Sequence, residues 1–111
     1  AMAVVANLMV DQGTDFETTI DISGSDGNPV NLTGYTIAGQ VRKAYTSSTA
    51  YNFIASVIFP ETGTVNIQLA NASTSNMKAG RYVYDVEMTS PSGVKTRVVE
   101  GILEITAEVT R

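Results

Sequence analysis

Apolar and polar residues alternate along most of the chain, and turn residues interrupt the alternation at short intervals. In the segment 16–22, the even-numbered positions are Phe16, Thr18, Ile20 and Ile22, and the odd-numbered positions are Glu17, Thr19 and Asp21. The segment 35–42 repeats the pattern, with Tyr35, Ile37, Gly39 and Val41 on one parity. Because successive side chains of a strand point to opposite faces, each segment predicts a strand with one buried face.

The same alternation returns near the N-terminus and in the second half of the chain. Its apolar parities are Val4, Ala6, Leu8 and Val10, then Val65, Ile67 and Leu69, then Tyr82, Tyr84, Val86 and Met88. In the segment 94–109 the apolar parity changes midway. Glu100-Gly101 lies at the change, and a glycine at such a slip of phase predicts a β-bulge.

The segment 53–59 is apolar on both parities. Its predicted core face carries Phe53, Ala55, Val57 and Phe59, and its other face carries Ile54 and Ile58. Such a segment is typical of a strand that is buried on both faces, or of a strand whose outer face rests on a partner chain.

Turn signals separate these strands. The stretches 23–29, 60–63 and 90–93 are rich in turn-forming residues, and the polar stretch 45–50 predicts a loop or a crossing between sheets. We expect one short helical turn near 71–78, with Asn71 or Ser73 as its cap. About seven or eight short strands with almost no helix indicate an all-β fold, either a β-sandwich or a small barrel.

Composition narrows the possible functions. The 111 residues indicate a single domain over 1–111. The chain has no cysteine and no histidine, so thiolate metal sites and the commonest general base are excluded. Eleven acidic against seven basic residues give a net charge of −4, which does not favour nucleic-acid binding. No apolar run approaches the roughly 20 residues of a membrane helix, so we expect no membrane partner.

The carboxylates favour a solvated surface over a reactive centre. Asp11, Asp15, Asp21 and Asp26 lack the spacing of a calcium loop. Asp85 and Glu87 lie two residues apart on one strand, and the chain has no tryptophan as a sugar platform, which disfavours glycoside hydrolysis. We therefore expect no enzyme, no catalytic residue, no metal site, no cofactor and no small-molecule substrate.

The basic and aromatic residues have structural interpretations as well. Arg42-Lys43 with Tyr45 and Tyr51 is a small basic-aromatic patch, interpreted as a strand end that meets water. Arg81, Lys95 and Arg97 are expected to pair across strands with Asp85, Glu87 or Glu100. Tyr82 and Tyr84 are expected to include a tyrosine corner, in which a hydroxyl bonds to upstream backbone; display at an interface is the alternative.

Several segments resemble a bacteriophage structural module: Gly13-Thr14-Asp15-Phe16, Leu32-Thr33-Gly34-Tyr35-Thr36, Gln40-Val41-Arg42-Lys43, Ala79 to Glu87, Thr96 to Gly101 and Glu108-Val109-Thr110-Arg111. Together they resemble the N-terminal immunoglobulin-like domain of phage baseplate upper proteins and of related tail and virion proteins. The resemblance implies an immunoglobulin-like antiparallel β-sandwich and a non-enzymatic virion structural protein of the tail, baseplate or neck. It also implies other virion subunits as partners and no catalytic residue.

Two apolar segments are the candidate protein–protein interfaces of such a subunit, which we expect to form a homo-oligomer. Ile54 and Ile58 remain once the core face of their strand is assigned. Val4, Val5, Leu8 and Met9 follow, because an apolar terminal strand can add to the sheet edge of a neighbour. Burial inside the same domain is the alternative for both segments.

Two other function classes stay open from the residues. The first is a β-sandwich that binds a carbohydrate or receptor on the host surface, and the second is a bacterial cell-surface immunoglobulin-like module. The missing tryptophan weighs against sugar stacking. The N-terminal segment lacks the basic and apolar regions of a signal peptide, which weighs against the cell-surface module. We therefore expect a location in the virion, after assembly in the cytoplasm of the host bacterium.

Overall fold

The computed structural model describes residues 4–107 and residue 109 of the chain. One sheet contains β1 (Val4–Val5), β2 (Leu8–Asp11), β4 (Thr36–Arg42), β5 (Tyr51–Asn52), β8 (Gly80–Thr89) and β9 (Lys95–Thr106). The other sheet contains β3 (Phe16–Asp21), β6 (Ile54–Phe59) and β7 (Thr64–Leu69). The two helical turns of the described residues are a 3₁₀ turn, η1 (Pro60–Thr62), and α1 (Asn71–Thr74).

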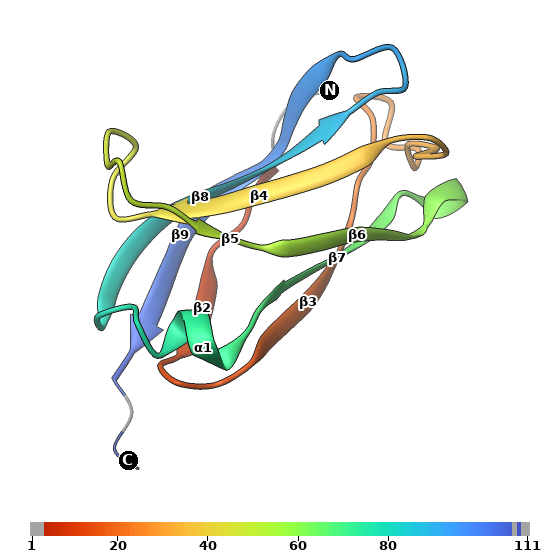
Figure 1. The fold of residues 1–111 in the computed structure, drawn as a ribbon. Coiled ribbons are helices and arrows are strands. Elements are labelled where there is room, and N and C mark those ends of the chain that lie inside the picture. Colours follow the sequence, from red (N-terminus) through yellow and green to blue (C-terminus); the bar gives the residue numbers. More distant parts are fainter. Residues whose placement is uncertain (1–3, 108, 110–111) are drawn as a thin grey trace.

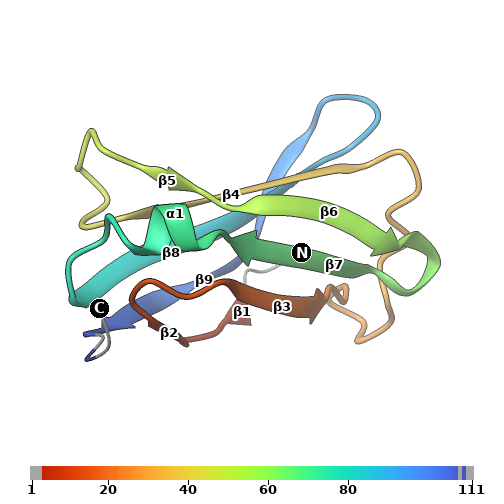
Figure 2. The same ribbon diagram turned by 60° about the horizontal axis from the view of Figure 1, so that its bottom comes forward.

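The two sheets face each other as the layers of a sandwich, which Figure 2 shows from below (Figures 1 and 2). The larger sheet has the order β1-β9-β8-β4-β5, with β2 also paired to β9, and the smaller sheet has the order β3-β7-β6. This arrangement confirms the predicted all-β, immunoglobulin-like sandwich. The described part of the chain contains nine strand segments, against the seven or eight predicted. Two of them, β1 and β2, are short strands that both pair with β9, and the short strand β5 leads into β6.

The predicted alternation positions most of the core. In β8 the buried parity is Tyr82, Tyr84, Val86 and Met88, as the sequence indicated, and in β7 it is Val65, Ile67 and Leu69. The ring of Phe53 packs edge to face on Tyr84, with centroids 5.9 Å apart. Because Phe53 lies where the chain leaves the larger sheet, this contact joins Tyr84 of β8 to the segment that leads into β6.

The N-terminal strands are an exception to the predicted antiparallel order. β1 and β2 run parallel to β9, with Val4 beside Val99 and Leu8 beside Leu103. The close approach of this segment explains Gly101, because a Cβ there would overlap the carbonyl oxygen of Ala6. The pattern of apolar residues predicts a strand but not its partner, so the parallel pairing was not predictable.

The chain changes sheets at Phe53, and the loop at 45–50 precedes that crossing. Tyr51 and Asn52 pair with β4, whereas Ile54 onward pairs with β7. At the crossing, the Phe53 N–H donates a 2.9 Å hydrogen bond to the carbonyl oxygen of Gly39. A Cβ on Gly39 would lie 2.8 Å from the Phe53 ring, so a larger residue would not fit there.

Two β-bulges occur among the described residues, and neither lies at the predicted position Glu100-Gly101. In β9, Val86 pairs with Val99 and Glu87 pairs with Arg97, so Val98 is the extra residue, not Glu100 or Gly101. Val98 and Val99 are consequently both buried. In β6, the register shifts between Val57 and Phe59, and Phe59 is exposed although the alternation predicted it in the core.

The helical turn α1 lies within the predicted segment 71–78, but neither Asn71 nor Ser73 is its cap. The N-cap residue is Ala70, whose side chain has no hydrogen-bonding group. The carboxylate of Asp15 instead accepts a 2.7 Å hydrogen bond from the Asn71 N–H. A residue distant in sequence thus takes over the capping function, which a local pattern cannot show.

Candidate functional site

The exposed edge of the smaller sheet carries three large apolar side chains, Ile54, Ile58 and Phe59, which we name the β6 edge surface. Their exposed fractions are 60%, 41% and 62%. Among the described residues, β6 forms strand hydrogen bonds with β7 on one side and with no strand on its other side, although β4 lies nearby. Apolar residues on an unpaired strand edge are typical of a surface that another chain covers.

Phe59 belongs to this surface because of the bulge in β6. Ile58 is the extra residue, so Phe59 leaves the core parity and lies beside Ile58 on the outside. Pro60 follows at once and begins η1, which ends the strand. Pro60 was the one sequence signal that could have marked an irregular strand end and so an exposed Phe59.

The rest of the outer face of the smaller sheet is polar and internally hydrogen-bonded. Asn66 donates to the carboxylate of Glu17 at 3.0 Å, and Gln68 donates to the Asn66 side-chain oxygen at 2.8 Å. Thr64 donates to the carboxylate of Asp21 at 2.7 Å. These bonds leave the apolar side chains of this face concentrated on the β6 edge.

The second predicted interface, at the N-terminus, is divided by the structure. Val4, Val5 and Met9 are exposed, the last two to 69% and 67%. Leu8 is half-buried and packs against the core. Because β1 and β2 already pair with β9 of their own chain, only their outer edge and these exposed side chains remain for a partner.

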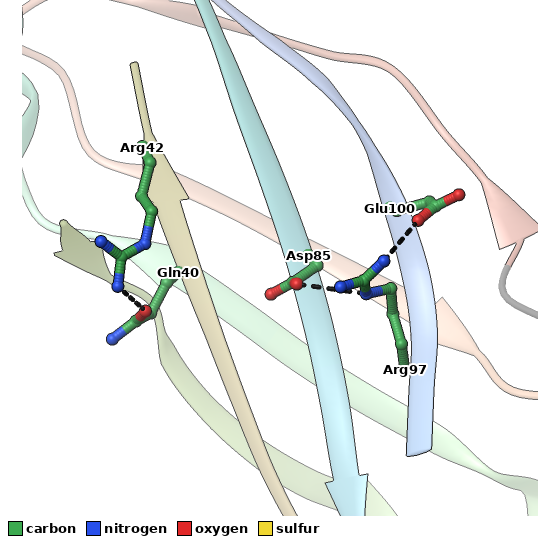
Figure 3. A network of polar contacts seen from close by, with 5 residues as sticks. All are labelled: Gln40, Arg42, Asp85, Arg97 and Glu100. Carbon is green, nitrogen blue, oxygen red and sulfur yellow. Dashed lines mark hydrogen bonds and ion pairs between the residues drawn. The ribbon is translucent and has the colours of Figure 1, made fainter. Parts of the chain in front are cut away.

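The outer face of the larger sheet carries a charged network (Figure 3). Arg97 forms ion pairs with Asp85 at 3.2 Å and with Glu100 at 3.1 Å, as predicted for Arg97. The hydrogen bond to Glu100 and the charge of Asp85 raise the pKa of Arg97. The Asp85 carboxylate is therefore engaged in a charge-assisted structural contact with the Arg97 guanidinium.

The four N-terminal aspartates lie apart and take part in separate hydrogen bonds. Asp11, Asp15, Asp21 and Asp26 accept from Thr106, Asn71, Thr64 and Asn28, respectively. The bond from the Asn28 N–H lowers the pKa of Asp26. The described residues contain no group of three or more metal-ligating side chains in one place.

No helix in the described part of the chain has the length and apolar character needed to cross a membrane.

Tyr82 forms the predicted tyrosine corner. Its hydroxyl donates a 2.9 Å hydrogen bond to the carbonyl oxygen of Lys78, four residues upstream. Burial is the main cause that raises the pKa of Tyr82. The hydroxyl of Tyr84 donates to the carbonyl oxygen of Ala6, and burial raises the pKa of Tyr84 to about 12. Both tyrosines therefore have structural roles in strand β8.

A pocket of about 580 Å³ lies where the β4–β5 loop meets the segment that follows α1. Its lining consists of Lys43, Ser47, Ser48, Thr49, Tyr51, Asn76, Lys78, Ala79 and Tyr82, and we name it the lysine pocket. The predicted basic-aromatic patch is thus divided. Lys43 and Tyr51 line this pocket, whereas Arg42 and Tyr45 line a different one beside Asp85. Lys78 and Tyr82 complete the lysine pocket and were not associated with Lys43 from the sequence.

No family model and no curated protein matches the chain. Among solved structures, the chain is similar to AggA, the major subunit of aggregative adherence fimbriae type I from Escherichia coli, with a TM-score of 0.50 and 12% identity. The match covers 90% of this chain and 89% of AggA. At that identity the likeness shows the fold alone.

Two larger proteins contain a similar region. An internalin-like protein of Listeria monocytogenes has a TM-score of 0.47 and 14% identity, over 96% of this chain and 28% of that chain. A family 123 glycoside hydrolase from Clostridium perfringens has a TM-score of 0.43 and 12% identity, over 96% of this chain and 24% of that chain. The chain therefore spans about a quarter of each, and these likenesses carry no argument about function.

Proposed function

We propose that this chain is a non-enzymatic structural protein of a bacteriophage virion, in the tail, the baseplate or the neck. Its role is to bind other virion subunits and further copies of itself. The proposal draws on the segments that resemble the immunoglobulin-like domain of phage baseplate upper proteins, such as Gly13–Phe16 and Ala79–Glu87. The immunoglobulin-like sandwich agrees with that resemblance.

The observation that carries the proposal is the β6 edge surface. This strand has an unpaired edge and exposes Ile54, Ile58 and Phe59. The neighbouring polar side chains of the same face form hydrogen bonds with one another. An exposed apolar edge favours aggregation unless a specific partner covers it. A subunit of a repeating assembly has such a partner at every copy.

The spacing along β6 suits pairing between two copies. If two β6 strands pair antiparallel about a two-fold axis through Ser56, Ile54 of each copy lies opposite Ile58 of the other. The two smaller sheets then form one continuous sheet, and the two isoleucine pairs cover each other on its outer face. AggA is likewise a subunit of a larger assembly, the fimbria.

The remaining parts of the proposal follow from this role. The protein needs no cofactor, metal or small-molecule substrate, and it is located in the virion after assembly in the host bacterial cytoplasm.

Recognition of a carbohydrate or receptor on the host surface is the second candidate function. The observation that favours it is the lysine pocket, whose lining combines charge, hydroxyl groups and tyrosines.

Gold-labelled antibodies against the purified chain test the proposed location. Intact particles of the phage that encodes the chain should carry gold at the tail, baseplate or neck. Antibody that was first absorbed with the purified chain is the matched control and should leave the particles unlabelled. Antigen found only in the soluble fraction of infected cells, never on particles, would overturn the proposal.

A further inference from the structure

We propose that the lysine pocket binds a carboxylated saccharide, an inference that does not depend on the assembly role proposed above. The pocket has about 580 Å³, within the range of small-molecule sites. It lies at the end of the sandwich, between the β4–β5 loop and the segment from Asn76 to Ala79, away from the residues of the β6 edge surface.

The charge of the lining selects an anion. Lys43 and Lys78 are both in the lining, and no carboxylate is. Four other pockets of the described residues each contain at least one of Asp21, Asp85, Glu87 and Glu104. In a chain with a net charge of −4, the lining of this pocket therefore contains two lysines and no acidic residue.

The ammonium group of Lys43 is placed by an aromatic ring. Its Nζ lies 4.8 Å from the ring centroid of Tyr82, which is a cation–π distance. Tyr82 is itself fixed, because its hydroxyl donates to the Lys78 carbonyl oxygen and its ring meets Tyr51 edge to face at 6.4 Å. The charge of Lys43 is thus held in position before a ligand arrives.

The rest of the lining fits a sugar ring with hydroxyl groups. Ser47, Ser48 and Thr49 provide hydroxyls, and Asn76 provides an amide. Tyr51 lines the same space and is half-buried, and its ring gives a sugar an apolar face in a chain without tryptophan. Hydroxyls and an amide around a cation match a saccharide better than an inorganic anion, which has no ring to stack.

Hydrogen bonds hold the walls of the pocket together. The Tyr51 hydroxyl donates to the Asn76 carbonyl oxygen at 3.4 Å and so links β5 to the segment after α1. In the loop, the Ala44 N–H donates to the Ser47 hydroxyl at 3.1 Å, and the Arg42 guanidinium donates to the Ser47 carbonyl oxygen. A pocket with tied walls loses little conformational entropy on binding.

The test is a nuclear magnetic resonance titration of the ¹⁵N-labelled full chain with N-acetylneuraminic acid. We expect amide shifts at Lys43, Tyr51, Lys78 and Tyr82. The methyl ester of the same sugar lacks the charge and should bind at least about tenfold more weakly, because a charge-assisted hydrogen bond is lost. N-acetylglutamate has two carboxylates but no sugar ring, and it should also bind more weakly despite its larger charge.

Variants separate the two lysines from general charge effects. Lys43→Gln and Lys78→Gln should each weaken binding at least about fivefold. Lys95→Gln is the matched control, because Lys95 is an exposed lysine outside the pocket, and it should bind like the wild type. All three replace exposed side chains, and the amide spectrum itself reports folding.

Three results would overturn the proposal. They are no shift with any of the three probes, equal binding of the acid and its methyl ester, and binding of N-acetylglutamate as tight as that of the sugar acid. The last result would assign the pocket to acidic peptides. A monomeric chain that still binds the sugar acid would refute self-assembly without affecting this inference.

Discussion

The Tyr84 hydroxyl donates a hydrogen bond to the carbonyl oxygen of Ala6, although the two residues are 78 positions apart in the chain. Tyr84 lies on the central strand β8 and Ala6 lies between β1 and β2, so the bond crosses beneath β9 to the edge of the sheet. The parallel N-terminal segment is thus held by its pairing with β9 and by this contact with the core.

Replacing Tyr84 with Phe should therefore destabilise the protein by about 1–2 kcal/mol, because the Ala6 carbonyl loses its buried donor. Urea denaturation measures the loss of unfolding free energy. Tyr35→Phe is the control, since the half-buried Tyr35 packs against the core and its hydroxyl has no such bond; it should change stability little. Equal stability of Tyr84→Phe and wild type would show that the contact does not matter.

Stability should also decline at alkaline pH. Burial raises the pKa of Tyr84 from its ordinary value of 10.0 to about 12, so the folded state holds this proton more tightly than the unfolded state. The resulting stabilisation is complete below pH 10 and is lost as the pH rises to about 12. Denaturant melts across this range should show the loss. Tyr84→Phe should show a smaller decline, and an identical decline would assign the effect to other groups.

Gly101→Ala should destabilise the protein by about 1–3 kcal/mol, because the new Cβ overlaps the Ala6 carbonyl oxygen. Amide exchange in Val4–Leu8 should become faster than in the rest of the sheet. Gly24→Ala is the control: its Cβ would meet the exposed side chain of Asp26 at 3.2 Å, a far less severe approach than at Gly101, so it should cost less stability. A Gly101→Ala protein with wild-type stability and exchange would contradict the packing of the N-terminal strands.

Asp15→Ala should cost about 1 kcal/mol, because the Asn71 N–H at the start of α1 loses its acceptor. Thermal unfolding gives the change in stability. Asp15→Asn retains a side-chain oxygen and should keep most of the stability that the alanine variant loses. If the alanine and asparagine variants both melt like the wild type, the carboxylate does not cap α1.

The strands and most of the core were predictable because alternation is a local property. In β8 the alternation of buried and less buried positions holds throughout, and the buried positions are Tyr82, Tyr84, Val86 and Met88. Phe59 did not follow it, because the bulge at Ile58 shifts the parity by one residue. Val98 was missed for a related reason: two adjacent valines are compatible with either phase, and only the partner strand decides which one is extra.

The candidate sites were predictable to different degrees. Ile54 and Ile58 could be identified because an apolar outer parity is visible in one segment. The lysine pocket could not, because Lys43 and Lys78 meet only through the pairing of β4 with β8 and the position of α1. Such contacts between distant segments depend on topology, and one sequence does not specify them.

The central claim is that copies of this chain associate through β6, and sedimentation velocity over a range of protein concentrations tests it most directly. The wild type should show concentration-dependent association, and the double variant Ile54→Ser with Ile58→Ser should sediment as a monomer with nearly unchanged thermal stability. Val94→Ser, which replaces an exposed valine on the β8–β9 turn, should associate like the wild type. A wild-type chain that stays monomeric at every concentration, or a double variant that associates equally well, would contradict the account.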